Sequence, residues 1–456
     1  MKFKSLFMAL IIGGGLWSCT GTPGASDAKK ENKKNEPSEV IGKASPMVEN
    51  GIMTPEVLYS FGRVGDVAIS PDRSRILYQV TYVSIPYNRT NSELFVMNSS
   101  GSDKMQLTSS NFRESQPRWI GNGDRIAFLS NESGSSQLWT MNPDGGDKKQ
   151  LSDVEGGVDG YIFSPDETKL LFVKSVKSVE TAPDKHSDLP EASGRIVNDL
   201  MYKHWDHWVE SVPHPFVADI SDGKLTNLRD IMEDEPYESP MAPFGGTEQL
   251  AWSPDGKTIA YTARKKTGKE YAVSTNSDIY FYDLESGETR NMTEGMMGYD
   301  VNPLFSPDGT KLAWLSMERD GYEADKNRLF VMDLASGDKT YVTESFDYNT
   351  EGIVWGDDNQ TLYMLSPYQG TNRIFSADIV TREITEIAGG KHDYISLDLV
   401  DGGLIAKRQS MSRPAEIYRV DLTSGEATEL SFENKHILDQ LTMGEVEERW
   451  IGTTDG

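Results

Sequence analysis

A short turn sequence that recurs along the chain constrains its fold more than any other feature. The clearest copy, Ser306-Pro307-Asp308-Gly309, follows Phe305 and precedes the apolar run Leu312-Ala313-Trp314. Proline presets the backbone of the first central turn position, aspartate can hydrogen-bond the backbone two residues on, and glycine accepts a positive φ without steric cost. The unit therefore predicts a strand, a tight turn and a second strand.

This turn sequence alternates with a second one along most of the chain. Further copies of the first, some of them degenerate, begin at Ser70, Gly121, Ser164, Ser253, Gly356 and Asp401. The best copy of the second runs from Leu329 to Gly337, and seven of each alternate without a gap. Each pair predicts one four-stranded blade, and seven blades in a ring bury faces that a single blade would leave exposed. The sequence therefore predicts an all-β fold, a seven-bladed β-propeller over residues 53–431.

The order of the turns also predicts how the ring begins and closes. Thr54 and Pro55 are typical of a short helix ahead of blade one. The chain enters at the first strand of blade one and leaves at the fourth strand of blade seven, so we expect closure by side-chain packing rather than by a borrowed strand. Two polar insertions interrupt the pattern, Ser175 to Pro215 inside blade three and Asp230 to Gly246 ahead of blade four.

The first fifty residues have the composition of a targeting segment and a linker. Residues 1–18 carry two lysines and then an apolar run from Leu6 to Leu16, which is too short to span a membrane and is typical of a signal peptide. The only cysteine, Cys19, follows in Leu16-Trp17-Ser18-Cys19, which resembles a bacterial lipoprotein cleavage box. Residues 19–50 predict a disordered tether. We therefore expect an exported lipoprotein of the periplasm or outer membrane, lipidated at Cys19; the alternative is an ordinary signal peptide with an incidental cysteine.

The charge balance limits the partners that this chain can have. A formal charge of −26 argues against binding to nucleic acid and to anionic membrane surfaces, so we expect membrane contact only through the lipid anchor. No cofactor is predicted. His204 and His207 are three residues apart, but no further ligand set accompanies them, and no metal site is predicted either.

The last residues, 432–456, have the pattern of a connector. Glu448 to Ile451 is typical of a strand, and Thr454-Asp455-Gly456 is typical of a hairpin turn. A turn without a second strand suggests that a further segment normally follows it.

The entry helix, the seven blades and the exit strand together resemble the N-terminal half of bacterial serine peptidases of the prolyl oligopeptidase family. The similarity is greatest to the dipeptidyl-peptidase and acylaminoacyl-peptidase branch, which also has a run similar to Asp199 to Trp208. This resemblance implies peptide substrates and, as a partner, a C-terminal α/β-hydrolase domain with a Ser-Asp-His triad. The chain contains no Gly-x-Ser-x-Gly nucleophile elbow, so we predict no catalytic residue in it and expect no hydrolysis by it alone.

The expected role is therefore that of the substrate-gating propeller of an exported serine peptidase that releases short peptides from N-termini. A dipeptidyl-type enzyme needs carboxylates to hold the ammonium group of its substrate. The candidate carboxylates are Asp206, Glu210, Glu233, Asp234 and Glu235, each of which is otherwise a solvated loop acid. The candidate aromatic contacts are His204, Trp205 and Trp208. The alternative for the two tryptophans is that they anchor the insertion to its blade.

Two functions from other classes remain open on the sequence alone. The blade turns are shared with periplasmic TolB-like propellers, so the chain is alternatively a freestanding lipoprotein propeller that binds envelope proteins. A propeller lyase or glycosidase would need acids that converge on the central channel, which the sequence cannot show.

Overall fold

The computed structural model describes residues 39–455. The chain divides into two units, Met1–Glu39 and Val40–Gly456, and every helix and strand given below belongs to the second. The predicted signal peptide and Cys19 lie outside the described residues, so their predictions are carried forward as such. Within the described residues, no helix combines the length and apolar character needed to cross a membrane.

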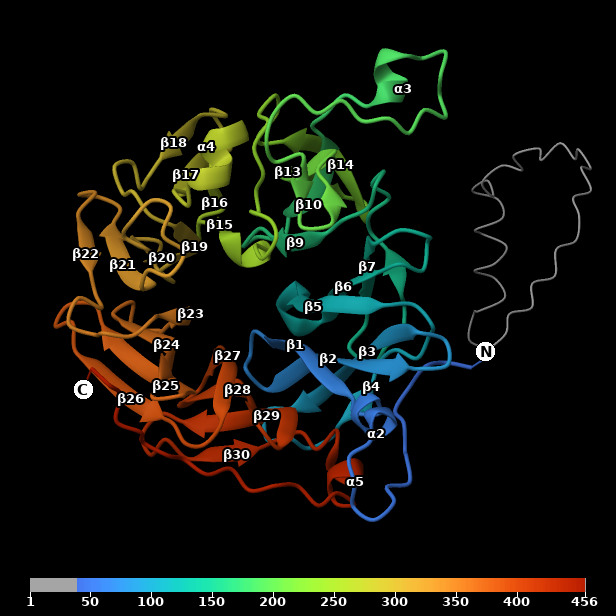
Figure 1. Cartoon of the computed structure of the whole chain (residues 1–456), viewed down its shortest axis with the longest axis vertical. Helices are drawn as coiled ribbons and strands as arrows, with labels where there is room; N and C mark the ends of the chain where they lie inside the picture. Colours follow the sequence, from blue (N-terminus) through green and yellow to red (C-terminus); the bar gives the residue numbers. More distant parts are fainter. Residues whose placement is uncertain (1–38, 456) are drawn as a thin grey trace, which may run out of the picture. The chain divides into compact units, whose positions relative to one another are not determined.

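Seven four-stranded antiparallel sheets follow one another around a ring (Figure 1). The first four blades contain β1 (Arg63–Ile69), β2 (Arg75–Ser84), β3 (Arg89–Asn98) and β4 (Met105–Gln106); β5 (Glu114–Ile120), β6 (Arg125–Ser130), β7 (Gln137–Met141) and β8 (Lys149–Gln150); β9 (Gly160–Phe163), β10 (Lys169–Lys177), β13 (Ser211–Ser221) and β14 (Lys224–Asp230); and β15 (Leu250–Trp252), β16 (Thr258–Ala263), β17 (Asp278–Asp283) and β18 (Thr289–Asn291). The last three contain β19 (Asp300–Phe305), β20 (Lys311–Ser316), β21 (Arg328–Asp333) and β22 (Lys339–Tyr341); β23 (Glu351–Trp355), β24 (Thr361–Tyr368), β25 (Thr371–Asp378) and β26 (Ile384–Ala388); and β27 (Asp393–Val400), β28 (Gly403–Ser410), β29 (Arg413–Asp421) and β30 (Ala427–Glu429). The predicted seven-bladed propeller of four-stranded blades is confirmed.

The recurring turn forms as its chemistry predicts. In each of its four Ser-Pro-Asp copies the serine hydroxyl donates a hydrogen bond of 2.6 Å to the aspartate two residues on, as in Ser306 and Asp308. This hydrogen bond and further donors from the turn lower the pKa of Asp308 to about 2. The aspartates of these turns are therefore structural, as predicted.

A hydroxyl residue that follows the second recurring sequence ties the third strand to the end of the fourth. The side-chain oxygen of this residue accepts a hydrogen bond of 2.7–3.0 Å from the backbone N–H of an apolar residue on the third strand in five blades. The hydroxyl residues are Thr108, Ser152, Thr293, Thr343 and Ser431. In blade seven the Ser431 hydroxyl also donates to Glu416, whose side chain is buried. The short fourth strands are thus held by side chains as well as by backbone pairing.

One apolar cluster lies between each neighbouring pair of blades, and together the seven clusters close the ring. The alternation along β20 shows how the sequence builds them. Leu312 and Trp314 pack in the cluster between blades four and five. Ala313 and Leu315 pack in the cluster between blades five and six, because successive strand residues point to opposite faces. The central strands are apolar throughout because both of their faces are covered.

The seam between blades one and seven closes without a shared strand. In the described residues the last sheet contains only β27 to β30, and the first only β1 to β4, which confirms the expected closure by side-chain packing. A cluster with members Tyr78 and Ile417 fills the seam. Arg73, on the first turn of blade one, makes ion pairs of 2.6 Å to Asp357 and 3.0 Å to Asp401, which lie on turns of blades six and seven.

The expected tether ends earlier than predicted, because residues 40–50 lie along the folded body. Ile41 is buried, and its backbone N–H donates to Asn111 Oδ1 at 3.0 Å. Lys43 pairs with the buried carboxylate of Glu433 at 3.1 Å. An imidazole nitrogen of His436, in helix α5 (Lys435–Leu438), lies 2.7 Å from the carbonyl oxygen of Ala44. Apolar and charged side chains in this polar stretch thus find partners that composition alone did not reveal.

The predicted ends of the folded part have different outcomes. Helix α2 (Pro55–Tyr59) begins as expected, with the Thr54 hydroxyl accepting a hydrogen bond from Val57 N at 3.3 Å. The predicted strand from Glu448 to Ile451 is wrong: this segment is irregular and pairs with no strand of the described residues. Ile451 is 82% exposed, so its apolar side chain has no sheet to pack on.

Strand direction divides the connections of the ring between two faces. Because each blade is a meander, the turns after its first and third strands lie on one face. The loops after its second strand and the links to the next blade lie on the other, which we call the loop face. Both predicted insertions belong to the loop face, and so do the start of β1 and the end of β30.

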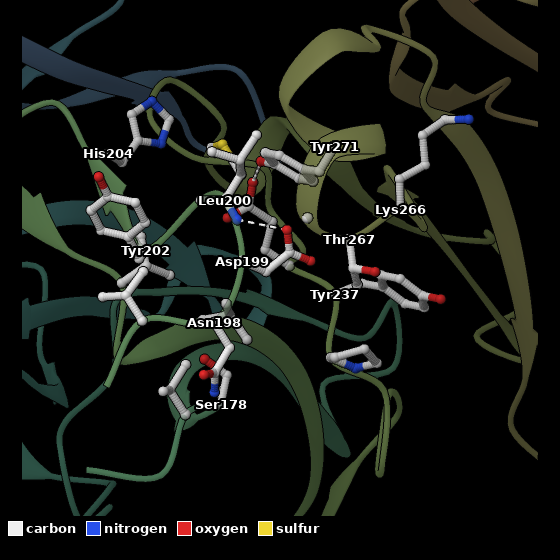
Figure 2. A pocket seen from close by; sticks show the side chains of 18 of the residues that line it. Ser178, Asn198, Asp199, Leu200, Tyr202, His204, Tyr237, Lys266, Thr267 and Tyr271 are labelled. Atoms are coloured by element: carbon white, nitrogen blue, oxygen red, sulfur yellow. Dashed lines mark hydrogen bonds between the residues drawn. The ribbon is translucent and has the colours of Figure 1, made fainter. Parts of the chain in front are cut away.

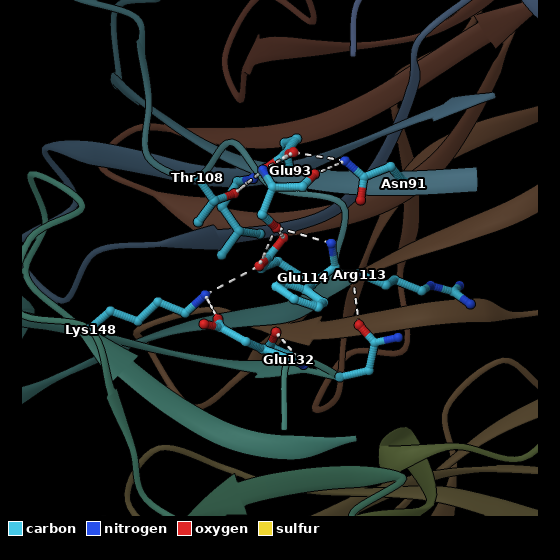
Figure 3. Close-up of polar contacts among 12 residues, drawn as sticks. Asn91, Glu93, Thr108, Arg113, Glu114, Glu132 and Lys148 are labelled. Carbon is cyan, nitrogen blue, oxygen red and sulfur yellow. Dashed lines mark hydrogen bonds and ion pairs between the residues drawn. The ribbon is translucent and has the colours of Figure 1, made fainter. Parts of the chain in front are cut away.

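Two buried carboxylates lie between blades one and two (Figure 3). Glu93 accepts a hydrogen bond of 2.6 Å from the Thr108 hydroxyl. Glu114 has Lys148 Nζ at 3.4 Å, yet burial outweighs this cation and raises the pKa of Glu114 to about 7. The neighbouring Glu93 carboxylate contributes in the same direction.

The hydroxyl of Ser431 is expected to stabilise blade seven measurably. Ser431→Ala removes an acceptor for a buried N–H and a donor to a buried carboxylate, so the free energy of unfolding should fall by about 1–3 kcal/mol. Denaturant unfolding measures this, with Thr423→Ala on an exposed turn of the same blade as the control. Equal effects of the two variants would contradict a role for the buried hydroxyl.

Glu114 is expected to make stability depend on pH. A carboxyl whose pKa is raised by folding stabilises the fold in its neutral form, and this stabilisation is lost as the pH rises through about 7. The free energy of unfolding of Glu114→Gln, relative to that of the wild type, should therefore rise by up to about 3 kcal/mol between about pH 5 and about pH 8. Unfolding measured at both pH values tests this, and a difference that does not change with pH would count against it.

Candidate functional site

Three segments of the loop face converge beside blades three and four. They are the insertion 178–210 between β10 and β13, the link 231–246, and the loop 264–277 between β16 and β17, which contains α4 (Gly268–Val273). All three line one pocket of about 340 Å³. Figure 2 shows Tyr202 and His204 on one side of this pocket and Tyr271 and Lys266 on the other.

A buried carboxylate, Glu238, lines this pocket. The hydroxyl of Tyr271 donates a short hydrogen bond to Glu238 Oε1. Burial raises the pKa of Glu238, and the Tyr271 hydrogen bond and the charge of Arg264 oppose that shift. The pocket thus holds a carboxylate that an incoming cation would stabilise.

Arg264 lies behind Tyr271 and fixes its ring. Its guanidinium carbon is 3.8 Å from the centroid of the Tyr271 ring, and its Nη1 donates to the carbonyl oxygen of Ser274 at 2.6 Å. Its Nε has no hydrogen-bond acceptor among the described residues. Tyr271 is therefore held between a cation on its face and a carboxylate at its hydroxyl.

The remaining wall of the pocket is largely apolar. The insertion and the neighbouring strand contribute branched and aromatic side chains: Val179, Ile196, Val197, Leu200, Tyr202, Val209 and Val212. Asp199 and Lys266, from opposite sides, are the other charged residues of the pocket, and Asp199 is exposed while Lys266 is half-buried. An apolar wall beside one buried charge is the usual composition of a small-molecule or peptide subsite.

The predicted aromatic residues lie on and beside this pocket. His204 lines it, and the hairpin of β11 (Lys203–His204) and β12 (His207–Trp208) pairs His204 with His207. Trp205 is 70% exposed and meets Phe244 of the link edge-on, with ring centroids 5.7 Å apart. Trp208 lines a second pocket of about 290 Å³ next to the first, with the Arg195 guanidinium 4.4 Å from its ring centroid. Over residues 39–455, no group of three or more His, Cys, Asp or Glu is arranged to hold a metal ion.

The predicted carboxylates do not gather around the pocket. Asp206 is exposed, and its Oδ1 lies 3.2 Å from His207 Nε2. Glu210 lies beside the second pocket, where its Oε1 is 2.9 Å from Arg195 Nε. Glu233 and Asp234 are exposed on the link. Glu235 is half-buried and pairs with Lys265 at 2.7 Å.

Glu238 is the acid that sequence reasoning missed. It belongs to the same acidic link as Glu235, only three residues further on. A run of acids does not indicate which member turns inward, because that depends on the strand edge against which the link packs. The aromatic and proline neighbours of Glu238, Tyr237 and the Ser239-Pro240 pair, are the one local signal of a packed backbone at this position.

The comparisons with known proteins agree with this architecture. Residues 248–440 match the family model of the TolB beta propeller domain. The chain is 47% identical over 424 residues to dipeptidyl-peptidase 5 of Porphyromonas gingivalis, a match that covers 92% of this chain and 62% of that relative. The chain thus spans less than two thirds of the length of that relative.

Two solved structures share the fold. The acylaminoacyl peptidase of Pyrococcus horikoshii superposes with a TM-score of 0.65 at 17% identity, over 84% of this chain and 55% of that one. The propeller domain of the trilobed protease from Pyrococcus furiosus, described as having an open velcro topology, superposes with a TM-score of 0.57 at 16% identity, over 83% of this chain and 98% of that one. The 47% identity over most of this chain shows that it is homologous to dipeptidyl-peptidase 5, and the solved structures show that its seven-bladed ring has the fold of the acylaminoacyl-peptidase propeller.

Proposed function

We propose that this chain is the substrate-gating propeller of an exported serine peptidase that releases short peptides from N-termini. In this proposal Glu238 binds the ammonium group of the substrate, and a C-terminal α/β-hydrolase domain supplies the Ser-Asp-His triad. The observation that carries the proposal is a buried carboxylate in a pocket on the loop face, where the chain also enters and leaves the ring. The 47% identity to a dipeptidyl-peptidase supports the same class of substrate.

A buried carboxylate discriminates strongly between free and blocked N-termini. An ammonium group offers three donors and a positive charge, and hydrogen bonds between ionised partners are about twice as strong as neutral ones. A blocked N-terminus offers one neutral N–H donor and no charge, so it would leave the buried Glu238 carboxylate without a cationic partner in the pocket. The apolar wall formed by Leu200, Val209 and Tyr202 would then take the side chain of the first residue.

The position of the pocket accounts for gating. Its walls are three loops on one face of the ring, so a substrate must be an extended chain end to reach Glu238. A hydrolase domain joined after β30 would begin on this same face, so the bound N-terminus and the catalytic groups would lie on one side of the propeller. The distance from Glu238 to the nucleophile would then fix how many residues are released.

Export and lipidation form a further part of this proposal that rests on the sequence alone. The segment up to Cys19 would direct the chain out of the cytoplasm, and lipid on Cys19 would tether it in the periplasm or on the outer membrane. Mass spectrometry of the N-terminal peptide from membranes tests this, because diacylglycerol on Cys19 is lost in Cys19→Ser.

The TolB family match over residues 248–440 favours one alternative, a propeller that binds envelope proteins. The reading frame that follows the codon of Gly456 separates the two proposals. A Gly-x-Ser-x-Gly motif in that frame supports the peptidase, and an unrelated gene supports the binding propeller.

Glu238→Gln is expected to weaken binding of an unblocked tripeptide to this chain about tenfold or more, because a neutral amide cannot pair with the ammonium group. Isothermal titration calorimetry measures this. The matched control is Glu233→Gln, an exposed acid of the same link, which should bind as the wild type does. An N-acetylated tripeptide that binds the wild type as tightly as the free one would refute the proposal.

Tripeptide affinity is expected to fall as the solution becomes acidic. Because burial raises the pKa of Glu238, its free carboxylate takes up a proton at a higher pH than an exposed glutamate does, and the neutral acid cannot hold an ammonium group. Titrations at about pH 7.5 and about pH 5 should show this loss for the wild type and no such change for Glu238→Gln. Affinity that rises toward acid pH would exclude Glu238 as the binding group.

A further inference from the structure

Glu238 keeps its place through a histidine that does not line the pocket. We propose that His214 of β13 is a positioning residue, which fixes the backbone of the link at Glu238 through contacts of both its ring nitrogens. The inference about the backbone stands by itself, and its consequence for peptide binding rests on the function proposed above. His214 is 2% exposed, and sequence analysis alone gave no reason to select it.

The contacts of His214 bind two ends of the link together. Its Nδ1 lies 2.9 Å from Asp230 Oδ2, where β14 ends and the link begins. Its Nε2 lies 2.9 Å from the carbonyl oxygen of Tyr237, the residue before Glu238. Asp230 is itself fixed, because its Oδ1 accepts a hydrogen bond of 2.8 Å from Met232 N.

The edge of β13 on either side of His214 completes the clamp. The carbonyl oxygen of Pro213 accepts from Ser239 N at 2.9 Å, and that of Pro215 accepts from Ile231 N at 3.1 Å. Residues 211–215, on the N-terminal side of Phe216, have no partner in β14, so this edge of β13 is free to hold the link instead. Glu238 is thus bracketed by a hydrogen bond to the residue before it and one from the residue after it.

The two contacts of His214 need its rigid ring. One ring nitrogen faces the Asp230 carboxylate and the other faces the Tyr237 carbonyl oxygen, and both of these oxygens can only accept hydrogen bonds. A side chain with its hydrogen-bond donors at one end only cannot serve both partners, so it would free one end of the link.

Hydrogen exchange of the full chain tests the clamp without any peptide. Protection of residues 231–239, corrected for intrinsic rates, should be at least about fivefold lower in His214→Gln than in the wild type. The glutamine amide has donors at one end only, so its oxygen faces either the Asp230 carboxylate or the Tyr237 carbonyl oxygen. His186→Gln, on an exposed part of the insertion, should behave as the wild type.

A double variant separates positioning from a merely structural role. In His214→Gln with Asp230→Asn, the asparagine amide can donate to the glutamine oxygen while the glutamine amide donates to Tyr237. This pair should restore protection to within about twofold of the wild type. Wild-type protection in His214→Gln, or a double variant that stays unprotected while its circular dichroism is native, would overturn the inference.

Tripeptide titration of the same variants measures the consequence for the pocket. His214→Gln should weaken binding and the double variant should recover it. If the wild type binds no tripeptide, the proposed function fails, but the exchange experiment still decides whether His214 positions the link. If the tripeptide binds the wild type and His214→Gln equally well, the link to peptide binding is overturned.

Discussion

Antiparallel connection within each blade is the constraint on which the rest of this structure depends. Four strands that reverse direction at every step return the chain to the face from which it started. Tight turns therefore gather on one face, and every connection long enough to carry an insertion gathers on the other. The pocket follows from this arrangement. The insertion of blade three, the link that follows it and the loop of blade four all come after a second or fourth strand, so all three lie on the loop face.

Side chains, rather than a shared strand, close the ring at the seam between blades seven and one. Tryptophans on the first strands of blades two, four and six donate from Nε1 to a backbone carbonyl of the preceding blade, at 3.1–3.2 Å. Every second blade thus carries this tryptophan, and with an odd number of blades the pattern cannot continue across the last seam. The seam between blades seven and one has no such tryptophan. It is held by an apolar cluster, by the Arg73 ion pairs and by Glu433, which binds Lys43, Lys104 and the Tyr82 hydroxyl. The two ends of the folded body thus supply the closure that a borrowed strand supplies elsewhere.

Local chemistry decided how much of this could be predicted. The Ser-Pro-Asp turns, the helix at Thr54 and the count of seven blades follow from neighbours in the sequence, and the structure confirms them. The strand expected at Glu448 to Ile451 fails because a strand needs a partner edge that the sequence of the segment cannot provide. The same limit explains why Glu235 was proposed and Glu238 was missed. Which acid of the link is buried depends on Pro213 and His214, which are more than 20 residues away in the chain.

The most direct measurement is a crystal structure of this chain with a tripeptide that has a free N-terminus. We expect the ammonium nitrogen about 3 Å from a carboxylate oxygen of Glu238, with the first side chain against the apolar wall. We also expect the tripeptide to displace the Tyr271 hydroxyl or to share the carboxylate with it. A tripeptide bound in the central channel, or one that approaches Glu238 with its carboxyl end, would contradict the role assigned to this pocket.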